Sequence, residues 1–516
     1  MPIKRSLVTA LMFACAVPLA NAAEYRTGYL PPTAAEQAWA DANMIQVSTV
    51  LPNRLALQRV AAEQQIRQGF AAPITIVAAE DGSEILGVKG AAAAPATKNL
   101  TDPVVMAYPR AIDNSAEAWF PVIGQQGGLG SCASFSTTYY TMTSQVARLR
   151  GWNVKTDKNP AHIFTPRFTY NMINNGVDWG SHHLTAFWLL TTTGCATYAD
   201  FPYDAKDYKS WPITASVWRE ALNYRMLDCG TVLAIDTAAG LANAKQMLAD
   251  GYIFNFPAAV LNWQYVSFAN DPATTADDAF FATGVPNSRR QVVSHCTDGE
   301  VNHAMTVVGY NDDVWCDINS NGVVDAGEKG ALRIANSWDT GWGDAGFAWV
   351  SYDALKTVSA VPGGFSGPRE EAIADHRLDW MSARPPYTPS LVAEVTVTHA
   401  QRNQMSITVG RGPTTATSPT KTSGFNKLSN RGGSWAFDGT STAIPATFII
   451  DCTDLINTAS GDRWFASFND NAASVPGSFT KVRFISGSNT VTEATGTNPS
   501  GGMPTRTLAY RLIRRP

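Results

Sequence analysis

The sequence predicts an α+β protein in which a helical half and a strand-rich half enclose a cleft, followed by an all-β domain. Apolar residues at helical spacing dominate residues 133–193, whereas β-branched and aromatic runs dominate residues 304–350. Helices followed by strands favour segregated layers over an alternating α/β fold. After residue 390, short alternating runs between Gly, Ser, Thr and Asn loops are typical of a β-sandwich.

Length and composition agree with a protein of several domains. The 516 residues are enough for two or three domains, and a composition of 45% hydrophobic and 16% charged residues is globular. The net charge of −4 gives no reason to expect nucleic-acid binding. No run is long enough and apolar enough to span a membrane.

The N-terminus has the pattern of a secretory signal. Lys4 and Arg5 precede the apolar run 7–19, and Ala20-Asn21-Ala22 forms a small-residue cleavage site. We therefore expect residues 1–22 to be a signal peptide cut before Ala23, and the protein to be secreted or periplasmic.

Residues 23–107 read as a separate leader segment. Helical patterns cover 36–43 and 53–68, a strand pattern covers 71–79, and residues 91–97 are a low-complexity, linker-like stretch. A helical segment ahead of a reactive cysteine suggests a pro-region that blocks the site until it is removed. A small N-terminal domain that stays attached explains the pattern equally well.

The glycine-rich segment 126–132 ends in a single cysteine, Cys132, and a predicted helix over 133–150 follows at once. Its apolar face consists of Phe135, Tyr139, Met142, Val146 and Leu149. The partial positive charge at a helix N-terminus favours a thiolate, which is the nucleophile of acyl transfer. The sequence thus predicts a nucleophilic cysteine.

A nucleophilic cysteine needs a base, and the base needs a group that orients it. His303 begins the β-branched strand pattern 303–310, so a strand would hold its backbone still. Asn336 lies in Arg333-Ile334-Ala335-Asn336-Ser337-Trp338, and its amide oxygen can accept a hydrogen bond from an imidazole without adding charge.

These three segments, in the order Cys, His, Asn, resemble the papain-like cysteine peptidases. Gln126-Gly127 with Gly130-Ser131-Cys132 is similar to the nucleophile segment of that family. Asn302-His303-Ala304 is similar to its histidine segment, and Asn336-Ser337-Trp338 with Gly341-Trp342-Gly343 to its asparagine segment. The resemblance covers about residues 108–375 and implies a two-lobed domain, with a helical lobe and a β-barrel-like lobe, here assigned to 108–383.

The resemblance also implies residue roles. Cys132 would be the nucleophile, His303 the general base and then acid, Asn336 the orienting residue, and Gln126 an oxyanion donor beside the Cys132 N–H. Trp338 would shield the Asn336–His303 contact, and Gly180 would border the substrate. Leu129 stands where the family usually has a cysteine, so the usual disulfide there is missing. The spacings between the motifs are long, which implies insertions near 265–299 and between the His and Asn strands.

The second insertion carries a calcium-loop pattern. Residues 317–328 fit D-x-[DN]-x-[DN]-G-x5-E at every specified place. The expected ligands are Asp317, Asn319, Asn321, Asp325 and Glu328, with the Val323 carbonyl. The flanks look like strands, so we expect a structural Ca²⁺ in an EF-hand-like loop within a β-hairpin. No organic cofactor is expected.

Six cysteines remain after the predicted signal peptide, and an oxidising compartment favours pairing. We expect Cys195–Cys229 and Cys296–Cys316 as disulfides, although sequence alone does not fix connectivity.

The C-terminal part follows a proline-rich linker at 384–390. Strand-like runs lie at 391–397, 405–409, 434–437, 446–451, 464–468, 479–485 and 508–512. They predict a β-sandwich over 391–516. Its aromatics, such as Trp435 and Trp464, are expected in the core rather than in a carbohydrate platform, and a surface or glycan ligand stays open.

The sequence therefore predicts a secreted cysteine endopeptidase of bacterial style, made as a zymogen and acting on a protein or peptide substrate. Two alternatives stay open. One is a non-catalytic glycan- or protein-binding protein on the same scaffold. The other is a transpeptidase of the same acyl-enzyme mechanism.

Overall fold

The computed structural model describes residues 26–68, 74–78, 84–88, 108–271, 291–424, 428–456, 462–472, 475–487, 489–499 and 506–511. The expected signal peptide, the low-complexity stretch 91–97 and part of the first expected insertion lie outside these residues. In the described part of the chain, no helix is long and apolar enough to cross a membrane.

The helices gather in the leader and in the first half of the central region. They are α1 (Ala34–Asn43), α2 (Arg54–Gln68), α3 (Cys132–Ser134), the π-helix η2 (Phe135–Met142), α4 (Thr143–Arg150), α5 (Pro166–Ile173), α6 (His183–Thr192), α7 (Ala215–Ala221) and α8 (Ala238–Ala249). The elements α3, η2 and α4 form one uninterrupted run over 132–150, which confirms the helix predicted there. Gly151, in the left-handed conformation, ends it.

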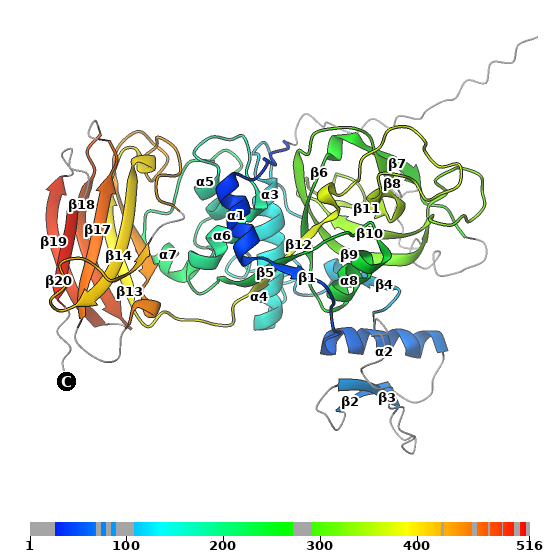
Figure 1. Cartoon of the computed structure of the whole chain (residues 1–516), viewed down its shortest axis with the longest axis horizontal. Coiled ribbons are helices and arrows are strands. Elements are labelled where there is room, and N and C mark those ends of the chain that lie inside the picture. The colour runs from blue at the N-terminus through cyan, green and yellow to red at the C-terminus, as the bar shows by residue number, and fades with distance from the viewer. Residues whose placement is uncertain are drawn as a thin grey trace, which may run out of the picture.

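A large mixed sheet forms the other half of the central region (Figure 1). Its strand order is β1-β5-β12-β6-β9-β10-β11-β8-β7, and β4 also pairs with β9. The bounds are β1 (Ile45–Val47), β4 (Ala111–Asp113), β5 (Met226–Val232), β6 (Phe254–Ala258), β7 (Trp263–Ser267), β8 (Gln291–Cys296), β9 (His303–Trp315), β10 (Lys329–Ala335), β11 (Phe347–Ser351) and β12 (Leu378–Ala383). The predicted strands of the β half therefore exist, but sequence patterning missed β5, β6 and β12 on the helical side.

Two buried clusters hold this central region together. One fills the sheet half, with Phe254, Phe256 and Leu332 among its fully buried members. The other lies under the helical run 132–150, where Phe120 stacks on Tyr140 with ring centroids 5.3 Å apart. Helical and sheet layers thus pack on each other along the run that begins at Cys132, which supports the expected α+β class.

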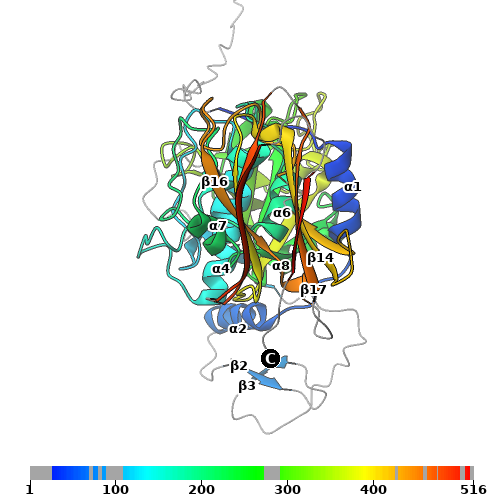
Figure 2. The same cartoon turned by 90° about the vertical axis from the view of Figure 1, so that its left-hand side faces the viewer.

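The leader wraps around the central region (Figures 1 and 2). Thr33 and Glu36 form a capping box at the start of α1, and Trp39 of this helix stacks on Trp188 of α6. The strand β1 then pairs in parallel with β5 and becomes the edge of the large sheet. Next, α2 packs against α8, and β2 (Ile74–Ala78) pairs with β3 (Glu84–Val88).

Residues 391–511 contribute two four-stranded antiparallel sheets, of order β16-β13-β18-β19 and β15-β14-β17-β20. The bounds are β13 (Val392–Thr398), β14 (Met405–Pro413), β15 (Lys421–Gly424), β16 (Pro445–Asp451), β17 (Asp462–Asp470), β18 (Ser478–Ser486), β19 (Asn489–Pro499) and β20 (Arg506–Arg511). The prediction of a strand at 434–437 is wrong. These residues form a loop with bends and a turn, and the packing of this loop buries the apolar side chains of Ala436 and Phe437 that had resembled a strand pattern.

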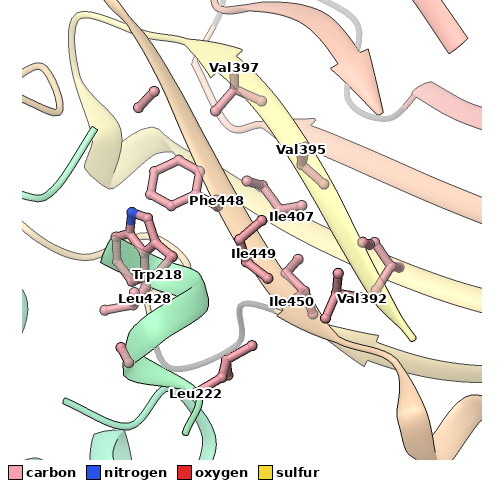
Figure 3. Close-up of a cluster of buried hydrophobic side chains, with 14 of the residues drawn as sticks. Trp218, Leu222, Val392, Val395, Val397, Ile407, Leu428, Phe448, Ile449 and Ile450 are labelled. Carbon is pink, nitrogen blue, oxygen red and sulfur yellow. The ribbon is translucent and has the colours of Figure 1, made fainter. Parts of the chain in front are cut away.

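One hydrophobic core joins this pair of sheets to the helical half (Figure 3). Trp218 and Leu222, on and directly after α7, lie in the same cluster as Val395 and Phe448 from the sheets. The Trp218 ring meets Phe448 edge-on, with centroids 5.0 Å apart. Trp464 is also in this core.

The linker and the cysteines differ from expectation. Tyr387 of the linker donates to Asp451 and lies under Arg225, so side-chain contacts fix this segment against both of its neighbours. All six cysteines that follow the expected signal peptide are buried, and neither expected disulfide forms. The hydrophobic clusters already enclose these thiols, which behave as small apolar side chains.

Candidate active site

Cys132 is the first residue of the helical run and is fully buried. The preceding loop is anchored from both sides. Gly130 N–H donates to Asp178 at 2.9 Å, and the hydroxyls of Ser131 and Tyr203 are 2.9 Å apart. The sulfur is therefore held at the end of a long helix by a loop that cannot move freely.

His303 and Asn336 come together from neighbouring strands. His303 begins β9, and Asn336 directly follows β10, which pairs antiparallel with β9. The His303 Nε2 and Asn336 Oδ1 atoms are 2.8 Å apart, and both residues are fully buried. The other ring nitrogen, Nδ1, is buried without a hydrogen-bond partner. One nitrogen is thus fixed, and the other is available for proton transfer.

The remaining expected residues surround this pair. The Trp338 ring lies over His303 with centroids 4.4 Å apart. Gln126 is fully buried, and its Oε1 accepts from the Ser337 hydroxyl at 2.6 Å. Its amide nitrogen donates to the Leu129 carbonyl at 2.9 Å and to the Arg26 carbonyl of the leader at 2.6 Å. The expected oxyanion donor therefore already holds a carbonyl oxygen.

The leader backbone runs between the two halves of the site. Gly28 and Tyr29 N–H groups donate to the Asn302 carbonyl at 3.0 and 2.9 Å. On the other side, Ser181 N–H donates to the Gly28 carbonyl at 2.8 Å, and Leu30 N–H donates to the Ser181 carbonyl at 3.2 Å. An extended peptide thus occupies the line between His303 and the Gly180–Ser181 segment, where a substrate would have to lie.

Glycines permit this close approach. A Cβ on Gly28 would lie 2.3 Å from the Gly130 Cα, and a Cβ on Gly180 would lie 1.9 Å from the Gly28 carbonyl oxygen. Gly180 also has a φ of +123°, which side-chain-bearing residues rarely adopt. The leader backbone at Gly28 therefore lies directly against the backbone of Gly180.

The buried site is electrically neutral. Burial raises the pKa of the Cys132 thiol from its ordinary value of 9.0 to about 11, against the opposing effect of nearby backbone N–H groups, including that of Gly28. Burial also lowers the pKa of His303 from 6.5 to about 4, and the Asn336 contact only partly offsets this. The expected thiolate is therefore absent while the leader covers the site, because desolvation outweighs the helix N-terminus.

The Tyr29 side chain enters a polar surrounding at the start of α6. Its phenol oxygen lies 2.6 Å from His182 Nε2 and 2.9 Å from His183 Nδ1, and both histidines are buried. Behind them, His183 Nε2 contacts the Asp379 carboxylate, which also pairs with Arg377. Only the pair His182-His183 was a visible signal; β12 and its acid were not.

The calcium-loop residues connect β9 to β10, the two strands that position His303 and Asn336. The Asp317 carboxylate accepts from the backbone N–H groups of Asn321 and Gly322, and the side-chain amides of Asn319 and Asn321 both contact Asp325. Gly322 takes the left-handed conformation with a φ of +74°. The loop is thus tightly turned around its oxygen-bearing side chains.

Glu328 closes the loop. Its carboxylate is buried and accepts from the Ile318 N–H, ten positions earlier, and from the Trp315 indole. Val323, at the carbonyl position, is exposed. Within the described residues, no group of three or more His, Cys, Asp or Glu side chains is placed to hold a metal ion. Amide and backbone oxygens would therefore have to complete any ion site here.

The sequence of residues 108–360 matches the family model described as papain family cysteine protease. This region is just under half of the chain and contains Cys132, His303 and Asn336. This match supports the statement that the chain is a cysteine-type peptidase. Among curated proteins, none matches the chain.

Several solved structures are similar to parts of this chain. Xylellain, a cysteine protease from Xylella fastidiosa, has 13% identity and a TM-score of 0.35, over 70% of this chain and 97% of its own. Bromelain from Ananas comosus, in complex with the E64 inhibitor, has 19% identity and a TM-score of 0.34, over 53% of this chain and 99% of its own.

Proposed function

We propose that the protein is a secreted cysteine endopeptidase, made as a zymogen, in which Cys132, His303, Asn336 and Gln126 carry out peptide hydrolysis. The observation that supports it most is the leader backbone lying as an extended peptide beside His303, with one carbonyl on Gln126. That arrangement is how a peptide would be presented to Cys132.

The reaction follows from the atoms present. His303 Nδ1 takes the thiol proton, and the Cys132 sulfur attacks the substrate carbonyl carbon. The oxygen becomes an oxyanion held by the Gln126 amide and the Cys132 N–H. His303 then gives its proton to the departing amine, which leaves a thioester. Water, deprotonated by His303, cleaves the thioester, releases the acid and restores the thiol.

Asn336 and Trp338 serve this proton transfer by fixing the ring. The contact between His303 Nε2 and Asn336 Oδ1 sets which nitrogen faces away from Asn336, and the Trp338 ring covers one side of the imidazole. The Asn336 amide oxygen is neutral. It therefore orients the His303 ring without making it harder for the protonated ring to give up its proton.

We further propose that the leader (residues 23–107) is an inhibitory pro-region. It blocks the site sterically, and its burial of Cys132 and His303 keeps both uncharged. Removal of the leader would rehydrate both groups and allow the thiolate–imidazolium pair to form.

Intact-mass spectrometry of wild type, Cys132→Ala and the control Cys452→Ala tests this proposal. We expect loss of the leader and peptide hydrolysis in wild type and in the control, because Cys452 lies in the distant sandwich core. Cys132→Ala should keep the leader and lose hydrolysis by roughly 10⁴-fold or more. Full turnover by Cys132→Ala would refute the proposed nucleophile.

We also propose that the loop 317–328 binds Ca²⁺ through Asp317, Asn319, Asn321, Asp325, Glu328 and the Val323 carbonyl. The gathering of Asn319 and Asn321 around Asp325 supports it. A bound ion would stiffen the connection between β9 and β10. Thermal unfolding with chelator, with Ca²⁺ and with Mg²⁺ tests this: a rise in melting temperature with Ca²⁺ is expected, and no dependence on Ca²⁺ would overturn it.

A further inference from the structure

We infer that the surroundings of the Tyr29 side chain, named here the Tyr29 site and formed by Ala133, His182, His183 and Ala304, select a tyrosine side chain in the substrate. This inference rests on the proposed peptidase function and names the substrate class for it. The argument starts from the hydrogen-bonding capacity of the two histidines.

His182 presents a donor to the phenol. It is the N-cap of α6, and its Nδ1 accepts from the Leu184 N–H at 3.0 Å. In a neutral ring the proton then sits on Nε2, which lies 2.6 Å from the Tyr29 hydroxyl oxygen. Burial and the neighbouring His183 lower the pKa of His182 well below its ordinary value, so the ring stays neutral.

His183 presents an acceptor. In the neutral tautomer whose proton lies on Nε2, facing the Asp379 carboxylate, Nδ1 accepts from the phenol at 2.9 Å. Arg377 also pairs with the Asp379 carboxylate, at 2.7 Å. Although burial alone would raise it, the contacts with His183 and Arg377 hold the pKa of Asp379 at about 2.

The site thus offers one donor and one acceptor to a single hydroxyl group. A tyrosine satisfies both at once, and burial raises the pKa of the Tyr29 phenol, so that it keeps its proton to donate. The aromatic ring lies against Ala133, Ala304 and the reactive Cys132. A phenylalanine would fill the same space but leave two buried polar atoms unpaired, which is the condition under which an enzyme discriminates strongly.

The Tyr29 site is reached by whatever peptide occupies the line of the leader. The backbone groups that flank Tyr29 bond to Asn302 and Ser181, which neighbour His303 and Gly180. A substrate that uses the same backbone partners places one side chain in the Tyr29 site. The leader, on this account, blocks the enzyme by offering the side chain that the site selects.

The test measures kcat/KM for pairs of peptides. The two members of a pair carry Tyr or Phe at one fixed position and the same mixture of amino acids at every other position. The protein is used as produced, once its peptide-hydrolysing activity has reached a plateau. Product masses locate the position relative to the cleaved bond. We expect one position at which Tyr exceeds Phe by roughly 10²-fold. Hydrolysis with no such preference at any position would overturn the inference, whereas no hydrolysis of any peptide would overturn the proposed function itself.

His182→Asn is the matched variant, because Asn is a good N-cap and keeps the bond to the Leu184 N–H while removing the donor to the phenol. We expect the ratio of kcat/KM for the Tyr peptide to kcat/KM for the Phe peptide to fall by about tenfold. An unchanged Tyr-to-Phe ratio in this variant would contradict the role of His182.

A second readout does not depend on turnover. The readout uses chains that keep both the Cys132 thiol and the leader. In these chains, Tyr29→Phe should speed the labelling of Cys132 by a thiol-reactive probe about tenfold, since the leader loses its hydroxyl contacts. Equal labelling rates in Tyr29→Phe and wild type would show that the hydroxyl contacts contribute nothing to binding and would overturn the inference.

Discussion

The peptidase domain is flanked by two segments, and the kinds of contact that attach them to it differ. The leader is held near the site by backbone hydrogen bonds, an edge strand and small residues such as Gly28. The C-terminal sheets are joined to the helical half by one continuous apolar core that contains Trp218 and Phe448. Burial of apolar area is the larger and less reversible contribution to stability.

The difference indicates which segment can be removed. Release of the leader would expose backbone groups that can bond to water instead, together with a few small apolar side chains such as Ala40 and Ala56. Separation of the sheets would expose large side chains to water, with no comparable compensation. The C-terminal sheets therefore act as a permanent part of the peptidase, although a proline-rich linker precedes them.

The C-terminal region also supports the site directly. Trp435 donates to the Gly176 carbonyl at 3.0 Å, and Lys209 lies over its ring. Gly176 belongs to the loop that leads to Gly180 and Ser181. A loop of the C-terminal region thus braces the segment that contacts the leader.

The largest expected effect comes from the apolar junction. Trp218→Ala removes a fully buried indole between the helical half and the sheets, and should lower the free energy of unfolding by about 3–5 kcal/mol. The matched change in the leader, Trp39→Ala, removes a ring stacked on Trp188 and should cost much less. Urea unfolding of both variants measures the two losses. Equal losses of the free energy of unfolding would contradict the distinction between the leader and the C-terminal sheets.

The second-largest effect is expected at Gln126, whose side-chain amide contacts the leader and is the proposed donor to the oxyanion. Gln126→Ala should lower kcat by about 10²–10³-fold, because one preorganised donor is lost. It should also loosen the leader, since the contact with the Arg26 carbonyl disappears. The exposed neighbour Gln125 gives the control variant, Gln125→Ala. A normal kcat in Gln126→Ala would remove it from the catalytic set.

Acid should open the leader. His303 has a pKa of about 4 when covered and an ordinary value of 6.5, so the covered state binds fewer protons. The covered state is therefore most stable above pH 6.5 and loses stability as the pH falls toward 4. The low pKa of buried His182 acts in the same direction. The measurement uses Cys132→Ala chains, in which leader release is followed by limited proteolysis at a series of pH values because this variant has no Cys132 thiol to label. Equal resistance of the leader to proteolysis at pH 4 and at pH 7 would contradict the expected acid release.

The smallest effect is expected at the rim. Arg26 pairs with Asp178 at 2.7 Å, but half of its side chain is exposed. Arg26→Ala should weaken leader docking by less than about 1 kcal/mol and speed Cys132 labelling only a few-fold. A change as large as that of Tyr29→Phe would mean that charge, rather than the Tyr29 site, dominates docking.

Local signals predicted much of the fold. The helix from Cys132, the helices α5 and α6 and the strands β9 and β10 were visible because apolar residues recur along them at helical spacing or in β-branched runs. The strands β5, β6 and β12 were missed because polar or strand-breaking residues interrupt them: an Asp and a Gly in β5, an Asn and a Pro in β6, and an Asp in β12. Their place in the sheet depends on partners far away in the sequence.

The sequence by itself determined the chemistry of the site: a cysteine at a helix start, a histidine at a strand start and an asparagine after the next strand are each tied to a local pattern. Only the tertiary structure decided what surrounds them. Tyr29 meets His183 across 154 positions, His183 meets Asp379 across 196 positions, and the Gly28 backbone of the leader reaches Cys132. Desolvation and hydrogen-bond complementarity depend on which distant segments come together, and no local pattern records that.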